Sequence, residues 1–168
     1  MKKDLAIIAG LVLVIVFFII FGRGFSTGQF ITPSATGSAE TQKKENTQVT
    51  VKDLAIKAKI ADEPKEQQTG LADYSSLGLD EGMIFVFDQS KRHTFWMKDM
   101  DFAIDIIWID DQKKIVDIAQ NVPPDPGRDD KELNKYKPKA DAKYVLEINA
   151  GVSSLHNLQV GDQASFEL

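Results

Sequence analysis

Residues 102–109, FAIDIIWI, constrain the fold of this chain more than any other stretch. Their side chains alternate between two faces, as in a β-strand, and both faces are largely apolar, which is typical of a strand covered on both sides. One row contains Phe102, Ile104, Ile106 and Trp108, and the other contains Ala103, Asp105, Ile107 and Ile109. An ionised carboxylate in a buried row is costly unless it is paired or hydrogen-bonded. The sequence therefore predicts that Asp105 is buried and has a dedicated partner.

Two kinds of partner are open for Asp105. Residues 93–98 are predicted to be a strand that precedes residues 102–109 across a tight polar turn, and Lys98 then faces Asp105 across the hairpin. The alternative is a carboxylate that accepts hydrogen bonds from backbone N–H groups. A functional interpretation uses the same hairpin. Trp96, Lys98 and Asp105 would lie on one side of it and line a shallow pocket, with Trp96 as an aromatic platform for a polar ligand such as a sugar or a peptide.

Short apolar runs separated by turn residues continue along the rest of the chain. Residues 54–60 alternate apolar side chains with lysines and predict a half-buried strand. Further runs predict strands at residues 82–87, 114–119 and 144–148, and a last strand after residues 161–162. Between them, residues 121–143 contain four prolines and predict a long irregular loop, a kind of segment that is often functional or disordered.

Two short helices complete the predicted fold. Asp62 is the expected N-cap of the first, with Pro64 in its first turn and Gly70 at its end, and the second lies within residues 150–159. About seven short strands without alternating long helices indicate an α+β fold that is mainly antiparallel β, barrel-like or a sandwich.

The N-terminal part of the chain predicts one transmembrane helix in front of this fold. Residues 5–21 form an uncharged apolar run of 17 residues, which spans a bilayer with help from Gly22 and from the long side chains of Lys3 and Arg23. A cleaved signal peptide is the alternative, but no small-x-small cleavage site follows closely. More positive charge precedes the run than follows it, so the N-terminus is expected in the cytoplasm.

The predicted organisation therefore has three parts. Residues 1–23 are the anchor, which contacts the bilayer through residues 5–22, and residues 24–48, rich in Gly, Ser, Thr, Gln and Lys, are a flexible linker. Residues 49–168 are the extracytoplasmic domain, at the cell membrane.

Composition excludes several classes of function. The chain has no cysteine, which rules out disulfides, zinc-thiolate sites and a cysteine nucleophile. From residue 46 onward 22 acidic residues face 15 basic ones, a net charge of about −7, and no basic patch interleaved with aromatics is present. Nucleic acid is therefore not expected as a partner.

An ordered set of motifs resembles a known family. TGLADYSSLGLDEGMIFVF, HTFWMKDMDFAIDIIWID, KIVDI, NVPP and YVLEINAGVSSLHNLQVGD follow, in this order, the pattern of domain of unknown function family 192, DUF192, over about residues 51–166. The resemblance implies a small, mainly β domain, often exported or membrane-tethered, and it brings no established activity. The matching positions are Gly70, Gly82, Met83, Trp96, Met97, Lys98, Asp105, Glu147 and Gly151. The family usually has Asn-Thr at Asp99-Met100 and Pro at Ala103.

Binding of a polar envelope ligand or protein partner is the function that these residues favour, through Trp96, Lys98, Asp105 and Glu147. An envelope hydrolase acting on glycans or peptides is an alternative, because Glu147 would supply the second acid that glycoside hydrolysis requires beside Asp105. No catalytic residue, metal ligand or cofactor is assigned.

A Cu(I)-handling or purely structural domain is a further alternative. His93, Met97 and Met100 offer the imidazole and thioether ligands that suit Cu(I). On a strand, however, His93, Phe95 and Met97 point the same way, and methionine among aromatic residues usually fills space in a core. The sequence favours this packing interpretation over a metal site.

Overall fold

The computed structural model describes residues 44–168. The predicted transmembrane segment, residues 5–21, and most of the predicted linker lie outside the described residues. Within residues 44–168, no helix is both long enough and apolar enough to cross a membrane.

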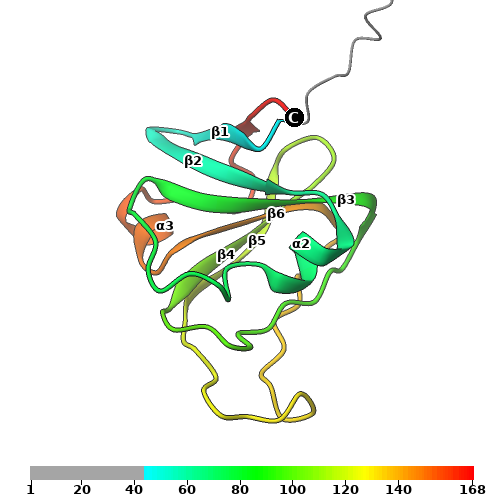
Figure 1. Ribbon diagram of the computed structural model, residues 1–168. Coiled ribbons are helices and arrows are strands. Elements are labelled where there is room, and N and C mark those ends of the chain that lie inside the picture. Colours follow the sequence, from blue (N-terminus) through cyan, green and yellow to red (C-terminus); the bar gives the residue numbers. More distant parts are fainter. Residues whose placement is uncertain (1–43) are drawn as a thin grey trace, which may run out of the picture. The chain divides into compact units, whose positions relative to one another are not determined.

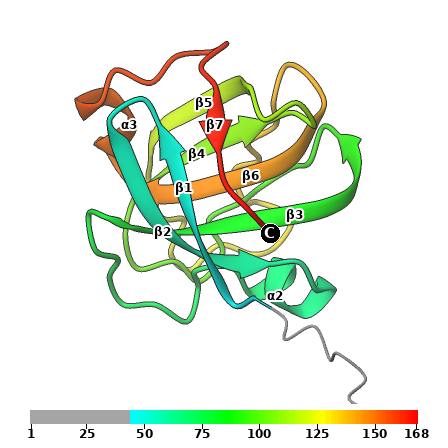
Figure 2. The same ribbon diagram turned by 90° about the horizontal axis from the view of Figure 1, so that it is seen from above.

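Seven strands form a single sheet that curls into a half-barrel (Figures 1 and 2). The strand order is β5-β4-β6-β3-β2-β1-β7, and every neighbouring pair is antiparallel except β2 and β3. This confirms the mainly antiparallel fold of about seven strands, in its barrel-like form. The strands are β1 (Asn46–Val51), β2 (Leu54–Ala61), β3 (Glu81–Lys91), β4 (Ile104–Ile109), β5 (Ile115–Val122), β6 (Ala142–Asn149) and β7 (Ala164–Ser165).

The two edge strands of the sheet, β5 and β7, approach each other at one end. Lys114, just before β5, forms an isolated bridge with Gln163, just before β7. The N–H of Ile115 donates to the carbonyl of Asp162 at 2.9 Å, and the N–H of Ala164 donates to that of Lys113 at 2.8 Å. These contacts close the half-barrel locally around an interior apolar core. That core includes Val49, Val51, Leu54, Ile56, Ile60, Ile84, Ile107, Ile109, Leu146, Ile148 and Phe166.

Strand β1 starts three residues before the predicted start of the domain. Its polar sequence, NTQVTV, resembles a linker, but alternate residues are buried in the interior. The buried Thr47 is satisfied because its hydroxyl donates to the carbonyl of Glu167 at 2.6 Å. The acceptor lies 120 residues away in the sequence, so no local sequence pattern predicts this hydrogen bond.

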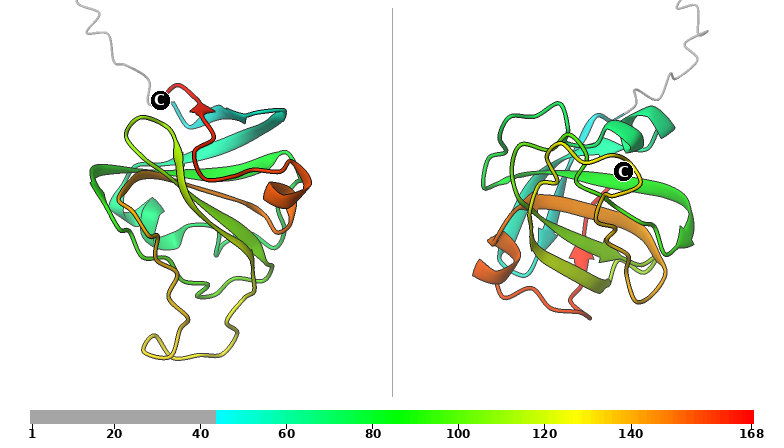
Figure 3. Two further views of the ribbon diagram at one scale, coloured as in Figure 1. Left: turned by 180° about the vertical axis from the view of Figure 1, so that it is seen from behind. Right: turned by 90° about the horizontal axis from the view of Figure 1, so that it is seen from below.

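A second apolar core lies on the outer face of the sheet. It includes Met83, Phe85, Met97, Ile104, Ile106, Trp108 and Val145. The cover consists of helix α2 (Pro64–Thr69), the residues after it and the irregular segments 92–103 and 123–141. Figure 3 shows the long loop between β5 and β6 extending from this side of the domain. Both faces of the central strands are thus covered, as the composition of residues 102–109 predicts.

The predicted strand at residues 93–98 is wrong. Strand β4 already pairs with β5 on one side and β6 on the other, so it has no free edge for a further strand. Residues 93–98 instead cross the outer core as an irregular segment, with one bridge between Phe95 and Tyr136. The segment turns at Asp99, whose φ of 56° is left-handed. Asparagine, the residue that the family resemblance implies at this position, tolerates this conformation well.

Both helices are short and lie where they are expected. Helix α2 has Pro64 in its first turn and ends at Gly70, but its N-cap is Glu63 and not Asp62. Glu63 and Glu66 form a capping box, in which each side chain accepts a backbone N–H of the other residue. Helix α3 (Val152–Leu155) follows β6 directly, with Gly151 as its N-cap in a left-handed conformation.

Candidate functional site

Two buried acids lie on the central strands and point to opposite faces of the sheet. In the register of β4 and β6, Asp105 is opposite Ile148 and Ile106 is opposite Glu147. Residues opposite each other share a face and successive residues alternate. Asp105 therefore belongs to the interior face with Ile148, and Glu147 belongs to the outer face with Ile106.

Asp105 is fully buried and has four hydrogen bonds. One carboxylate oxygen accepts the N–H groups of Asn121 at 2.8 Å and Gly151 at 3.1 Å. The other accepts the N–H of Ser153 at 2.9 Å and its hydroxyl at 2.7 Å. The carboxylate thus joins the end of β5 to the first turn of α3. The prediction that Asp105 is buried and has dedicated partners is confirmed. The partners are three backbone N–H groups and the hydroxyl of Ser153.

Lys98 is not the partner of Asp105. Its ammonium nitrogen lies 2.7 Å from a carboxylate oxygen of Asp130, in the long loop. Because residues 93–98 are not a strand, the predicted hairpin with Trp96, Lys98 and Asp105 on one side does not form. The combination of Asp105 and Glu147 as two acids of one active site is also wrong, because the two carboxyl groups lie on opposite faces.

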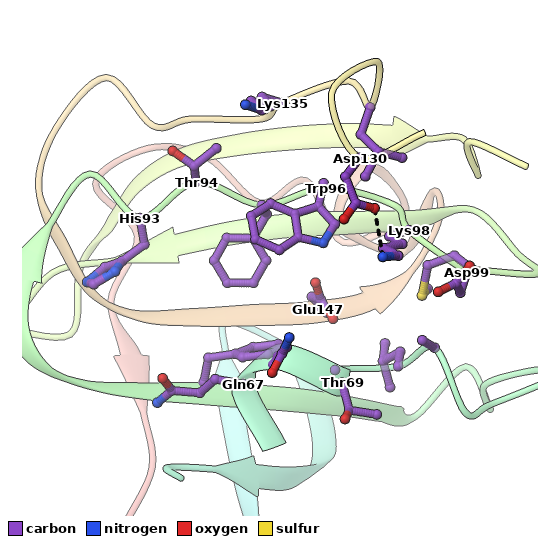
Figure 4. Close-up of a pocket in the computed structure, with 18 of the residues that line it drawn as sticks. Gln67, Thr69, His93, Thr94, Trp96, Lys98, Asp99, Asp130, Lys135 and Glu147 are labelled. Atoms are coloured by element: carbon purple, nitrogen blue, oxygen red, sulfur yellow. Dashed lines mark ion pairs between the residues drawn. The ribbon is translucent and has the colours of Figure 1, made fainter. Parts of the chain in front are cut away.

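A cavity of about 830 Å³ opens on the outer face of the sheet. Residues 67–73 form one wall, residues 93–96 and 98–100 form another, and the loop contributes Asp130, Leu133 and Lys135. Of the four predicted ligand-binding residues, Trp96, Lys98 and Glu147 line this cavity and Asp105 does not (Figure 4).

Glu147 lies in this cavity between Trp96 and the residues of α2 in the view of Figure 4. The residue is 5% exposed. Its carboxyl group has no hydrogen bond or ion pair with any of residues 44–168. Burial raises the pKa of Glu147 to about 8, with no charged neighbour to offset it. The side chain is therefore mostly protonated at neutral pH and has its hydrogen-bonding capacity free for a ligand.

Gly70 leaves the space in front of this carboxyl group. A Cβ atom at position 70 would lie 3.4 Å from the ring of Phe85 and 4.0 Å from a carboxyl oxygen of Glu147. The residue also has a φ of 54°, which favours glycine. Because residue 70 has no side chain, the end of α2 does not fill the part of the cavity next to Phe85 and Glu147.

Aromatic rings form much of the remaining wall. Phe85 and Phe95 meet edge to face, with ring centroids 5.0 Å apart, and Phe87 stacks on His93 at 3.6 Å. These rings are mostly packed, whereas Trp96 is 46% exposed at the rim. Trp96 therefore has an aromatic surface available to a molecule in the cavity.

An ion pair joins two segments at the rim. Lys98 and Asp130 are both exposed, and the hydrogen bond to Asp130 raises the pKa of Lys98 above its ordinary value. The loop that carries Asp130 is fixed internally by Asp125, which accepts the backbone N–H of Asn134 at 2.9 Å and its side-chain amide at 2.8 Å. The sequence did not predict which residues of this loop line the cavity. Only the length of the loop indicated that it could have a functional role.

The remaining family positions have structural explanations. A Cβ atom at Gly82 would lie 2.7 Å from the carbonyl oxygen of Glu147 and 2.8 Å from the side chain of Ile56, so only glycine fits there. Gly151 has a φ of 86° beside Asp105. Met83 and Met97 are buried in the outer core.

The packing interpretation of the methionines is confirmed. Met97 and Met100 are buried in the outer core, and His93 stacks on Phe87. In the part of the chain from residue 44 onward, no group of three or more His, Cys, Asp or Glu side chains is arranged to hold a metal ion.

Comparisons with known proteins agree with the fold. The model of the DUF192 family, described as Uncharacterized ACR, matches residues 47–166. A UPF0127 protein of Thermococcus sibiricus is 26% identical over 95 residues, and the match spans 54% of this chain and about half, 54%, of that relative's length.

Two solved structures have the same fold. A protein of unknown function from Novosphingobium aromaticivorans has a TM-score of 0.63 at 27% identity, over 71% of this chain and 83% of that chain. A protein from Sinorhizobium meliloti, described as a candidate transcription regulator, has a TM-score of 0.64 at 22% identity, over 73% of this chain and 92% of that chain. At this identity the second likeness shows the fold alone.

Proposed function

The chain belongs to the DUF192 family, a family of unknown function, and from this premise we propose that its outer cavity binds a small polar ligand through Glu147 and Trp96. Glu147 makes the hydrogen-bonding or charged contact in the interior of the cavity, and Trp96 stacks on the ligand at the rim. Lys98 and Asp130 border the entrance.

The unpartnered carboxyl group of Glu147 carries this proposal. Burial of a carboxyl group disfavours its charged form, so an acid at this position costs stability. A strand that served packing alone would have an apolar residue at this position, as the neighbouring Met83 and Ile106 do. The size of the cavity supports the same conclusion, because ligand pockets commonly occupy about 300–1,000 Å³.

A fluorescence titration tests the proposal. The chain has two tryptophans, and only Trp96 lines the cavity, while Trp108 is 1% exposed in the outer core. The full chain, purified in detergent, is screened with monosaccharides, dipeptides and small amines. A ligand of the cavity should change the emission of Trp96 and raise the melting temperature, and Glu147→Gln should abolish both effects.

The matched control is Glu45→Gln, which removes an exposed carboxylate before β1. It should bind every ligand as the unmodified chain does. Ligands that bind Glu147→Gln as tightly as the unmodified chain would contradict the proposal.

We also propose that this domain is held at the outer side of the cell membrane by residues 1–23, through the linker at residues 24–48. The uncharged run at residues 5–21 and the excess of positive charge in front of it support this arrangement. An envelope location would give the cavity access to sugars and peptides of the cell surface.

The absence of cysteine makes the location easy to test. Ser154→Cys introduces one exposed thiol in α3, and Asp4→Cys introduces one before the apolar run. In intact cells, a membrane-impermeant maleimide should label position 154 and not position 4, and both should react after the cells are lysed. Labelling of position 154 only after lysis would contradict the proposed orientation.

A further inference from the structure

We infer that the ligand of the outer cavity carries an ammonium group, which the carboxylate of Glu147 and the ring of Trp96 bind together. This inference rests on the proposed function and adds the chemical class of the ligand. It is drawn from the charge of the lining residues, from the aromatic surface at the rim and from the missing counter-charge of Glu147.

Acidic groups outnumber basic groups around the cavity. The acidic lining residues are Asp73, Asp99, Asp130 and Glu147, and the basic ones are Lys98 and Lys135. Lys98 is already bound to Asp130 at 2.7 Å. The cavity therefore attracts cations once Glu147 is ionised, and an anionic ligand would meet surplus negative charge.

The aromatic surface at the rim suits the same kind of ligand. Trp96 is 46% exposed, and tryptophan has the strongest attraction for a cation above its ring. Aromatic rings beside a carboxylate are a recurrent arrangement for binding amines and quaternary ammonium groups. Trp96 and Glu147 both line the cavity, and Figure 4 shows them together with Lys98, whose ammonium group is paired with Asp130.

Among residues 44–168, no lysine, arginine or histidine forms an ion pair with Glu147. Lys98 is paired with Asp130, and burial without a neighbouring charge raises the pKa of Glu147 to about 8. A bound cation would stabilise the ionised carboxylate, so binding releases the proton of Glu147 to the solvent. A neutral ligand would leave that proton in place.

Calorimetric titration of the full chain with two matched pairs of probes tests this inference. Choline is compared with 3,3-dimethylbutan-1-ol, its uncharged isostere, and glucosamine with glucose. The cationic member of a pair should bind and the neutral member should not. Choline keeps its charge at every pH, so its affinity should rise about 30-fold between about pH 6.5 and about pH 9 as Glu147 ionises.

Variants separate this inference from the proposed function. Glu147→Gln and Trp96→Leu should each weaken binding of the cation more than tenfold, while Glu45→Gln should bind as the unmodified chain does. Thermal unfolding of each variant shows whether it is folded. Equal, Glu147-dependent binding of neutral and cationic probes would overturn the inference and leave the proposed function intact.

A second result would also overturn the inference. If a sugar or peptide from the ligand screen binds through Glu147 while both cationic probes fail, the cavity binds a polar ligand that is not an ammonium compound. If neither the screen nor the four probes bind, the proposed function fails together with the inference.

Discussion

Asp105 and Glu147 are both buried acids on adjacent strands, yet their surroundings differ in almost every respect. Asp105 faces the interior of the half-barrel and accepts four hydrogen bonds from Asn121, Gly151 and Ser153. Glu147 faces the outer cavity, has no partner among residues 44–168 and has a pKa of about 8. Burial alone therefore does not reveal the role of a carboxylate, and the number of its partners separates a structural acid from a candidate binding group.

The largest expected effect tests the structural side of this comparison. Asp105→Ala leaves three backbone N–H groups and one hydroxyl without their acceptor, so the free energy of unfolding should fall by about 3 to 5 kcal/mol. Urea unfolding of the full chain measures it, with the exposed Asp101→Ala as the control, for which no measurable change is expected. A small effect of Asp105→Ala would mean that the hydrogen bonds at α3 are not important for stability.

The pH dependence of stability tests the other side. The pKa of Glu147 rises from 4.5 to about 8 on folding, so the folded state holds a proton that the unfolded state loses between these values. Stability contributed by this group is therefore greatest below about pH 4.5 and falls as the pH rises to about 8, by about 1.4 kcal/mol per pH unit.

Glu147→Gln should remove this slope. The difference between the unmodified chain and the variant, measured by urea unfolding across the same pH range, isolates Glu147 from all other acids. Parallel curves would show that the carboxyl group is not buried in its protonated form and would weaken the contrast with Asp105.

Glu147→Met sharpens the comparison further. Methionine has a similar length and removes a buried acid whose charged form is disfavoured, so stability at neutral pH should increase by about 1 to 2 kcal/mol while ligand binding is lost. Urea unfolding at neutral pH gives the value. A loss of stability would indicate that the carboxyl group has a structural partner after all.

The smallest effect is expected at Asp130, which has a partner but is exposed. Surface ion pairs contribute little because water solvates both groups and the side chains lose freedom when they pair. Asp130→Asn should therefore leave the midpoint of thermal unfolding unchanged within error. A clear decrease would mean that the pair with Lys98 holds the long loop against the rest of the domain.

Much of the fold could be predicted from the sequence because burial alternates locally along the strands. Residues 54–60 and 102–109 show this pattern; the first forms a strand as expected, and in the second the strand begins at Ile104 rather than at Phe102. The partners of Asp105 could not be predicted, because Ser153 is 48 residues away and meets it only after β4 and β6 have paired. The predicted strand at residues 93–98 failed because alternation shows which side chains are buried and does not show whether a neighbouring strand has a free edge.

The cavity was predicted only in part for the same reason. Trp96, Lys98 and Glu147 line it as single residues, but the face of Glu147 depends on its register with β4. The loop residues Asp130, Leu133 and Lys135 reach the cavity from an irregular segment that has no periodic pattern.

The place of β7 in the sheet determines when the domain can finish folding during synthesis. Strand β1 is the first strand to leave the ribosome, and one of its two neighbours, β7, is the last, with Val51 opposite Ala164. One edge of β1 therefore has no partner for almost the whole time that the domain is being made, and exposed strand edges promote association between chains. Completion of the half-barrel is consequently a late event in the synthesis of this domain, and a nascent chain halted before residue 164 presents an open edge to its neighbours.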